Sequence, residues 1–302
     1  MIGHFAATRT RRLSGLLSMM LASFLFSLMT VSVYAVSLCE PSLPTPMISF
    51  VRIGVNLCVL LIPALLGRQV LSLFGDMRIS LWMRGLFGTL ALLFSFASIQ
   101  RIGPGESSFL GASSGVFVVL LSPWVLKQKN TVWVWLAVLG SLAGVFFLFA
   151  PVSTVNADVL GRVMGLCSGL LSALAYLMVA RAGRSNSPQS VIFYFCLVAL
   201  LVHMAYFAFG GFVWPRASDT WLVMLGGGLA ASGAQFYMTR AYQMAPAALV
   251  SAVGYLAPVL SLIWGMWLFG RIPEIQALAG CALVLLCGVL LPFLTASSRR
   301  VT

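Results

Sequence analysis

Close to its end the chain contains three apolar segments in succession: WLVMLGGGLAASGAQFYMTRA (221–241), PAALVSAVGYLAPVLSLIWGMWLF (246–269) and EIQALAGCALVLLCGVLLPF (274–293). Each holds about 20 residues, which at 1.5 Å per residue is enough to cross the hydrocarbon core of a bilayer. The sequence therefore predicts three consecutive membrane-spanning helices.

The middle segment carries the residues least suited to a plain apolar helix, namely Ser251, Gly254, Tyr255 and Pro258. Pro258 removes a backbone donor and clashes with the preceding turn, so we expect it to kink or open the helix. Freed carbonyls in a membrane are tolerated only against protein or a water-filled cavity. The range 251–258 is thus the first place to look for a ligand.

The rest of the chain has the same character. It has 302 residues, of which 61% are hydrophobic and 8% charged, and its mean hydropathy is +1.03. Soluble domains carry about 25% charged residues, so this composition predicts an integral membrane protein. The net charge of +12 does not indicate nucleic-acid binding, because the basic residues lie between apolar segments. The six cysteines form no CxxC pair and are interpreted as apolar packing residues, so we expect no metal site and no cofactor.

Ten spans are predicted, all helical, because the alternating pattern of a barrel is absent. The seven before the opening three are Leu13–Leu38, Pro46–Leu66, Leu81–Ile99, Ser107–Leu126, Val132–Ala150, Gly161–Ala180 and Ser190–Phe209. With both termini cytoplasmic, 13 of the 18 basic residues fall on the inner side, as the positive-inside rule expects.

Short matches at a fixed spacing indicate an internal repeat. Residues 100–104 (QRIGP) resemble 242–246 (YQMAP), and 144–148 (GVFFL) resemble 288–292 (GVLLP). The predicted repeats are 1–152 and 153–302. Because each repeat has five spans, the second must insert upside down, which relates the two halves by an axis in the membrane plane, as in many transporters. Substrate is expected near the midplane between them.

These features resemble the drug/metabolite transporter superfamily and its ten-helix EamA-type members. The matching segments are Phe50-Val51-Arg52, Ala241-Tyr242, Tyr255-Leu256-Ala257-Pro258-Val259 with Leu268-Phe269-Gly270, and Gly280 with Gly288. The resemblance covers nearly the whole chain, and within the superfamily the chain is most similar to YddG-type amino-acid exporters. It departs from the family at Arg271, where a Glu is usual, so no role of that Glu carries over.

Polar and aromatic residues of both halves are expected to converge on a central pocket. The candidate substrate-binding residues are Gln100, Ser108, Ser113, Tyr176, Gln235, Tyr242, Ser251, Tyr255 and Trp264, and the candidate hinge or gating residues are Pro104, Pro246 and Pro258. The alternative for each of these residues is that it makes hydrogen bonds between helices, or lies at the lipid interface, and does not contact substrate.

Few ionisable residues lie within the predicted spans. None contains Asp or Glu in its interior, which favours uniport or exchange over proton coupling through a carboxylate. Arg52 either pairs with carbonyls or an outer-loop acid or contacts substrate, and Arg84 and Arg240 are expected to anchor to headgroups. His203 either carries protons or bonds a neighbouring helix. With no Arg or Lys cluster expected in the spans, a phosphorylated substrate is disfavoured.

One motif suggests a different class of protein. Residues 111–115 (GASSG) fit the G-x-S-x-G pattern, so Ser113 with His203 could act as an intramembrane serine hydrolase. Gly111 and Gly115 also form a GxxxG packing face, and the repeat architecture favours packing.

The sequence thus predicts a transporter, not an enzyme, in the inner (plasma) membrane. It would export aromatic or hydrophobic amino acids, or similar small metabolites, by alternating access. The alternatives are a phosphorylated-metabolite or drug transporter of the same fold. The expected partners are a small-molecule substrate and the lipid bilayer, without nucleic acid, and a monomer fits this architecture.

Overall fold

The computed structural model describes most of the chain. The described residues are 2–126, 139–140, 143–144, 147, 158–183, 185–245, 250, 253–270, 272, 275–276, 278–283 and 285–287, without the side chains of 2–12, 122 and 126. The predicted span Val132–Ala150 lies largely outside these residues, and Glu274–Phe293 lies partly outside them. Pro246 and Ser251 are also outside.

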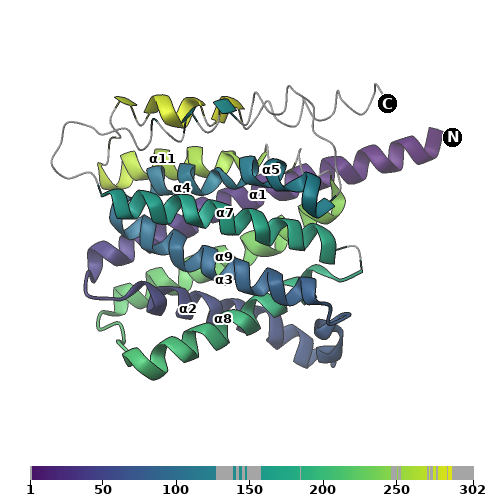
Figure 1. Cartoon of the computed structure of the whole chain (residues 1–302). Helices are drawn as coiled ribbons and strands as arrows, with labels where there is room; N and C mark the ends of the chain where they lie inside the picture. The colour runs from purple at the N-terminus through teal and green to yellow at the C-terminus, as the bar shows by residue number, and fades with distance from the viewer. Residues whose placement is uncertain are drawn as a thin grey trace.

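The described part is helical and contains no strand. Its elements are α1 (Ile2–Cys39), α2 (Thr45–Leu66), the short 3-10 helix η1 (Val70–Phe74), α3 (Ile79–Ile102), α4 (Pro104–Ala112), α5 (Ser114–Leu126), α7 (Val159–Ala182), α8 (Pro188–Gly210), α9 (Ser218–Met244) and α11 (Leu256–Phe269). They lie roughly side by side in a bundle (Figure 1). Six segments of this part are long and apolar enough to cross a membrane. Large apolar side chains such as Phe209 and Leu66 face outward, 95% and 82% exposed, which suits a lipid environment. The predicted all-α integral membrane fold is confirmed.

The predicted fourth and ninth spans are each interrupted, at positions that match in the repeat. α4 ends and α5 begins around Ser113, whose backbone N–H bonds to Leu110 O instead of continuing the α pattern. Tyr255 interrupts the other span just before α11. Pro258 therefore falls in the first turn of α11, where its missing N–H removes no helical hydrogen bond. The expected opening of the helix lies at Tyr255.

The first helices of the two halves run in opposite directions. α1 ends at Cys39, beside the loop that starts α2 at Thr45, and Thr45 donates a hydrogen bond to Gln100 near the end of α3. The adjacent Arg101 pairs with Asp158 at 2.9 Å, directly before α7 begins. α7 thus starts at the end of the bundle where α1 finishes, which is the inverted arrangement. We call this the Glu40 end, and the opposite one, where α2 finishes, the Asp76 end.

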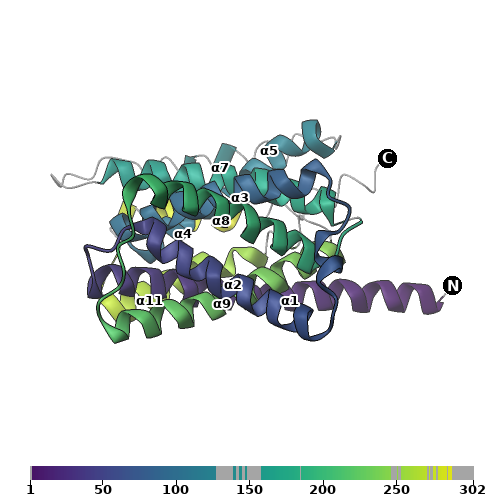
Figure 2. The same cartoon turned by 90° about the horizontal axis from the view of Figure 1, so that it is seen from below.

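Tight helix packing does not follow the two sequence repeats. α1 packs along α9 and α7 packs along α3, and these two closest pairs each join one helix from either half. Two further contacts also join helices of different repeats, because α2 packs on α9 and α8 packs on α3. The result is two mixed packing units, the first made of α1, α2, α9 and α11 and the second of α3, α4, α5, α7 and α8 (Figure 2). The units meet chiefly where α4 contacts α11 and where α2 contacts α8.

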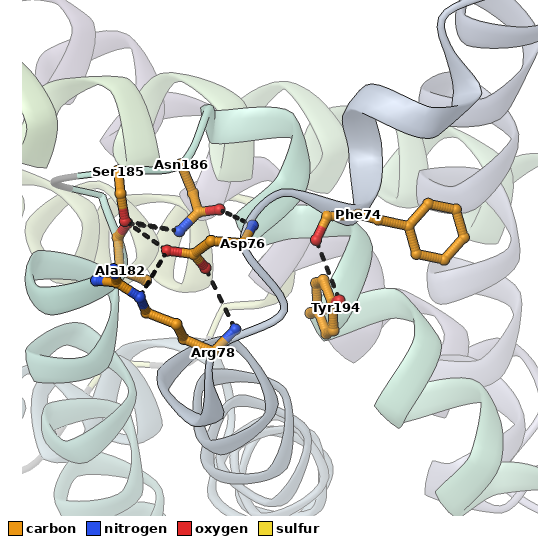
Figure 3. Close-up of polar contacts among 7 residues, drawn as sticks. All are labelled: Phe74, Asp76, Arg78, Ala182, Ser185, Asn186 and Tyr194. Atoms are coloured by element: carbon orange, nitrogen blue, oxygen red, sulfur yellow. Dashed lines mark hydrogen bonds and ion pairs between the residues drawn. The ribbon is translucent and has the colours of Figure 1, made fainter.

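At the Asp76 end, the loop that crosses from α2 to α3 is held against the α7–α8 connection. The Asp76 carboxylate accepts from Ser185 Oγ at 2.6 Å, and Asn186 Oδ1 accepts from the Asp76 backbone N–H at 2.9 Å. Tyr194 donates to Phe74 O at 3.1 Å, so α8 itself also holds the loop (Figure 3). The hydrogen bonds from Ser185 and Asn186, together with Arg78, lower the pKa of Asp76 below its ordinary value.

The hydrogen bonds around Asp76 predict a difference in stability between the wild type and Asp76→Asn that depends on pH. A carboxylate with a lowered folded pKa contributes stability that is present above its unfolded pKa, about 3.9, and that is lost as the pH falls through the folded value. We therefore expect Asp76→Asn to unfold at lower temperature at neutral pH, with the difference shrinking below about pH 4. Thermal unfolding in detergent from pH 7 to pH 3 measures it. A difference in unfolding temperature that stays constant over this range would show that the charge of Asp76 does not hold the loop between α2 and α3 in place.

Candidate functional site

A cavity of about 220 Å³ lies between the two packing units. Helices of both repeats line it: α1, α2, α3, α4, α5, α7, α8, α9 and α11 each contribute residues. Small residues on one face of α3, Gly88, Ala91 and Ser95, leave the space open on that side. The cavity therefore sits where the repeat architecture places a substrate.

Six of the sequence-predicted residues line this cavity. They are Ser108, Tyr176, Gln235, Tyr242, Tyr255 and Pro258. Tyr176 and Tyr242, from opposite halves of the chain, stack with ring centres 5.5 Å apart near the Asp76 end. They form an apolar, aromatic wall suited to a ring or an alkyl group.

Four other predicted residues lie away from the cavity. Gln100 accepts from Thr45 at the Glu40 end, and Trp264 donates to Ser27 Oγ at 3.2 Å. Ser113 donates to Leu110 O at 2.6 Å inside its own helix turn. Pro104 is the first residue of α4 and packs against α11. Pro246 and Ser251 are outside the described residues.

The proposed serine–histidine pairing is not formed. His203 Nε2 is 2.6 Å from Ser49 Oγ, and His203 Nδ1 is 2.6 Å from Ala199 O, so both ring nitrogens have other neighbours. Because Ser113 donates to a carbonyl and has no base beside it among these contacts, the geometry of an activated nucleophile is missing. Ser113 instead packs closely on Gly169 of α7.

Two arginines that are not among the candidate substrate-binding residues also line the cavity, and only for Arg52 was substrate contact one of the alternatives. Arg52 is 6% exposed and Arg84 is 3% exposed. The expectation that Arg84 anchors to headgroups is wrong, because Gly88 one turn later leaves room for its guanidinium to fold inward along α3. The argument against a phosphorylated substrate, that the spans hold no basic cluster, is therefore also wrong.

Both guanidinium groups lie against one aromatic ring. Arg84 Cζ is 4.8 Å and Arg52 Cζ is 5.9 Å from the centre of the Phe195 ring, and Arg52 Cζ is also 5.6 Å from the Phe96 ring centre. Contacts of this kind compensate a buried cation only in part. Phe195 thus fixes where the two positive charges face the cavity.

Several buried polar groups of the cavity have no hydrogen-bond partner among the described residues. They are Arg52 Nε, Arg84 Nε, Ser107 Oγ, Tyr255 Oη and Ser261 Oγ, five of the nine such groups in this part of the chain. A buried polar atom left unpaired costs about 1–3 kcal/mol, so their convergence marks the cavity as a place where polar ligand atoms are stabilised.

The cavity is bounded toward the Glu40 end by the contact of α4 with α11. Glycines permit this approach: a Cβ at Gly105 would lie 2.8 Å from Leu262 Cδ1, and one at Gly265 would lie 3.2 Å from Pro104 Cγ. Glu106 on the same helix pairs with Arg162 of α7 at 3.6 Å. The two helices therefore approach closely here, beside a second cavity of about 280 Å³ that both of them line.

The helical fold around a cavity lined by both halves suits a multi-pass membrane protein, and the family and relatives of the chain identify it as a transporter rather than an enzyme. The sequence pattern of the EamA-like transporter family matches residues 13–150 and again 159–293, and the chain belongs to that family, within the drug/metabolite transporter superfamily.

The relatives include transporters with named and unnamed cargo. The chain is 28% identical over 278 residues to the pseudopaline exporter CntI of Pseudomonas aeruginosa, covering 92% of this chain and 95% of that protein. It is 24% identical over 284 residues to solute carrier family 35 member G1 of Mus musculus, covering 89% and 76% respectively. One solved crystal structure aligns with a TM-score of 0.66 at 20% identity over 94% of this chain and 98% of the other, which shows a shared fold.

Proposed function

We propose that this protein exports amino acids or similar small metabolites across the cytoplasmic membrane by alternating access, as a uniporter or exchanger. The observation that carries the proposal is the cavity between two mixed packing units, whose lining combines a stacked aromatic pair with hydroxyl, amide and guanidinium groups. A pocket of this kind suits a small solute with an apolar body and a polar head. The similarity to an exporter over nearly the whole chain supports the outward direction.

The location of the acidic residues supports uniport or exchange. Among the described residues, Glu40, Asp76, Glu106, Asp158 and Asp219 all lie in loops or in the first turn of a helix, and no carboxylate lines the cavity. Proton coupling in transporters commonly uses an intramembrane carboxylate. We propose further that both termini are cytoplasmic, which makes the Asp76 end the cytoplasmic one and the packed α4–α11 end the outer one.

A second candidate is a phosphorylated-metabolite exchanger, and the single observation that favours it is the pair of cavity arginines. Flux through proteoliposomes separates the candidates. The purified full chain is tested for counterflow of a panel made of phenylalanine, glutamate, N-acetylphenylalanine, glycerol 3-phosphate and ethidium. We expect flux of amino-acid-type solutes. Flux of the phosphate ester alone would reverse the order of the two candidates, and flux of ethidium alone would favour drug export.

A further inference from the structure

The geometry points to a carboxylate-binding subsite formed by Arg52, Arg84 and Phe195, and hence to a transported solute with more carboxylates than ammonium groups. This inference rests on the proposed function, whose pocket it uses, and narrows the class of solute. The residues sit on α2, α3 and α8, so both packing units contribute to the subsite.

The first step is the charge balance of the pocket. Two guanidinium groups line it, and the acids of the described residues all have partners or positions elsewhere: Glu40 accepts from Arg216 N, Asp158 pairs with Arg101, and Glu106 pairs with Arg162. Asp76 bonds Ser185, and Asp219 is exposed in the first turn of α9. Arg52 and Arg84 have no ion pair among the described residues, so in that part of the chain the pocket carries two positive charges without an acidic partner.

The second step is the cost of that arrangement. A single charge in the interior of a membrane costs on the order of 3 kcal/mol on insertion scales, and two like charges near each other add repulsion that a low dielectric strengthens. Such residues in a span are usually paired or mark a substrate pathway. Because the described residues offer the two guanidinium groups no acidic partner, we infer that an anionic ligand stabilises this site.

The third step distinguishes anions from zwitterions. A neutral amino acid could place its carboxylate on one arginine, but its ammonium would find no carboxylate among the described lining residues and would be repelled by the second arginine. An N-acylated or dicarboxylic solute avoids this repulsion. Its carboxylate can accept hydrogen bonds from a guanidinium, in the charge-assisted geometry that arginine favours.

The fourth step places the rest of the solute. Ser107 on α4 and Ser261 on α11 offer hydroxyls without a hydrogen-bond partner in the described part of the chain, and Tyr255 offers a third at the break before α11. The stacked Tyr176 and Tyr242 supply the apolar wall. An anionic head on the arginines with an apolar or aromatic body against the tyrosines uses the pocket fully.

Equilibrium binding to the purified full chain in detergent tests the subsite without requiring transport. The probes are N-acetylphenylalanine, phenylalanine, the uncharged N-acetylphenylalaninamide and phenyl phosphate. We expect N-acetylphenylalanine to bind at least tenfold more tightly than the amide, a difference of about 1.4 kcal/mol. Arg84→Gln and Arg52→Gln should each abolish that preference, while Arg240→Gln, which changes an exposed arginine of α9, should preserve it.

Each result decides the question. Equal affinity of the wild type for the acid and the amide, or a preference that survives in both glutamine variants, would overturn the subsite. Tighter binding of phenyl phosphate than of N-acetylphenylalanine would overturn the carboxylate assignment. Arg84→Lys keeps the charge and guards against misfolding, and it should retain part of the preference because a lysine is a point charge without the planar fork. If N-acetylphenylalanine binds but is not transported, the proposed function alone is contradicted. If phenylalanine is transported and both glutamine variants transport it equally well, the carboxylate-binding subsite alone is contradicted.

Discussion

A disulfide between positions 105 and 262 should stop transport completely and reversibly. A Cβ at position 105 would lie 3.7 Å from Leu262 Cβ, inside the range of about 3.5–4.5 Å that disulfides require. The bond would join α4 of one packing unit to α11 of the other, where the two helices approach closely near the Glu40 end. Because alternating access requires this contact to open in each cycle, Gly105→Cys/Leu262→Cys is expected to lose all flux on oxidation and to regain it on reduction.

The measurement is efflux from proteoliposomes of whichever solute the panel identifies, in a background with the exposed Cys39 and Cys58 replaced by alanine. The two single-cysteine variants, treated with the same oxidant, are the controls and should keep their flux. A second readout needs no substrate. In the cross-linked protein, a cysteine introduced in the cavity by Ser172→Cys should react with impermeant maleimide from the Asp76 side and not from the Glu40 side. Undiminished flux at full cross-linking would show that this contact stays closed throughout the cycle.

The helices themselves were largely predictable from the sequence. Apolar length and flanking charges place α2 and α8 within a few residues of their observed bounds. The interruption around Pro258 was predicted as well, because a proline inside a membrane helix perturbs the backbone wherever it lies. The exact position of the interruption, at Tyr255, was not predictable, because nothing in the local sequence marks where the helix breaks. Ser113, at the matching position of the other half, carries no proline and gave no such signal.

The composition of the cavity was only partly predictable. Tyrosine, glutamine and serine stand out in apolar segments, so the polar lining from α7 and α9 was found. Arg84 was misjudged because it lies near the end of its span, where arginines commonly extend to headgroups. The spacing Arg84, Gly88, Ala91, Ser95 could have corrected this, since it puts an arginine on the same helix face as three small residues. The pairing of helices into the two mixed packing units could not be predicted from the sequence, because apolar helix faces resemble one another and do not specify which helix lies beside them.

The largest loss of stability is expected from Gly85→Leu. Gly85 lies where α3 crosses α8, and a Cβ there would come within 2.6 Å of Val198 Cγ2 and 2.7 Å of the Tyr194 backbone oxygen. Backbone cannot yield as a flexible side chain can, so the two helices would have to separate. Overpacking of this kind costs about 1–3 kcal/mol and occasionally more, and we expect about 3 kcal/mol here. Reversible unfolding in mixed detergent micelles measures the difference.

Gly226→Leu is the matched control, because a Cβ at Gly226 meets nothing within 4 Å and the residue is exposed on α9. Removing a helix-interior glycine there should leave stability unchanged or raise it by about 0.5–1 kcal/mol. The two substitutions also separate packing from function. Separating α3 from α8 moves Arg84 away from Phe195, so a mildly destabilising Gly85→Ala that still folds should weaken N-acetylphenylalanine binding, whereas Gly226→Ala should not. Equal stability of the two leucine variants would mean that the close approach of α3 to α8 is not required for stability, and equal binding by the two alanine variants would mean that it does not determine the position of Arg84.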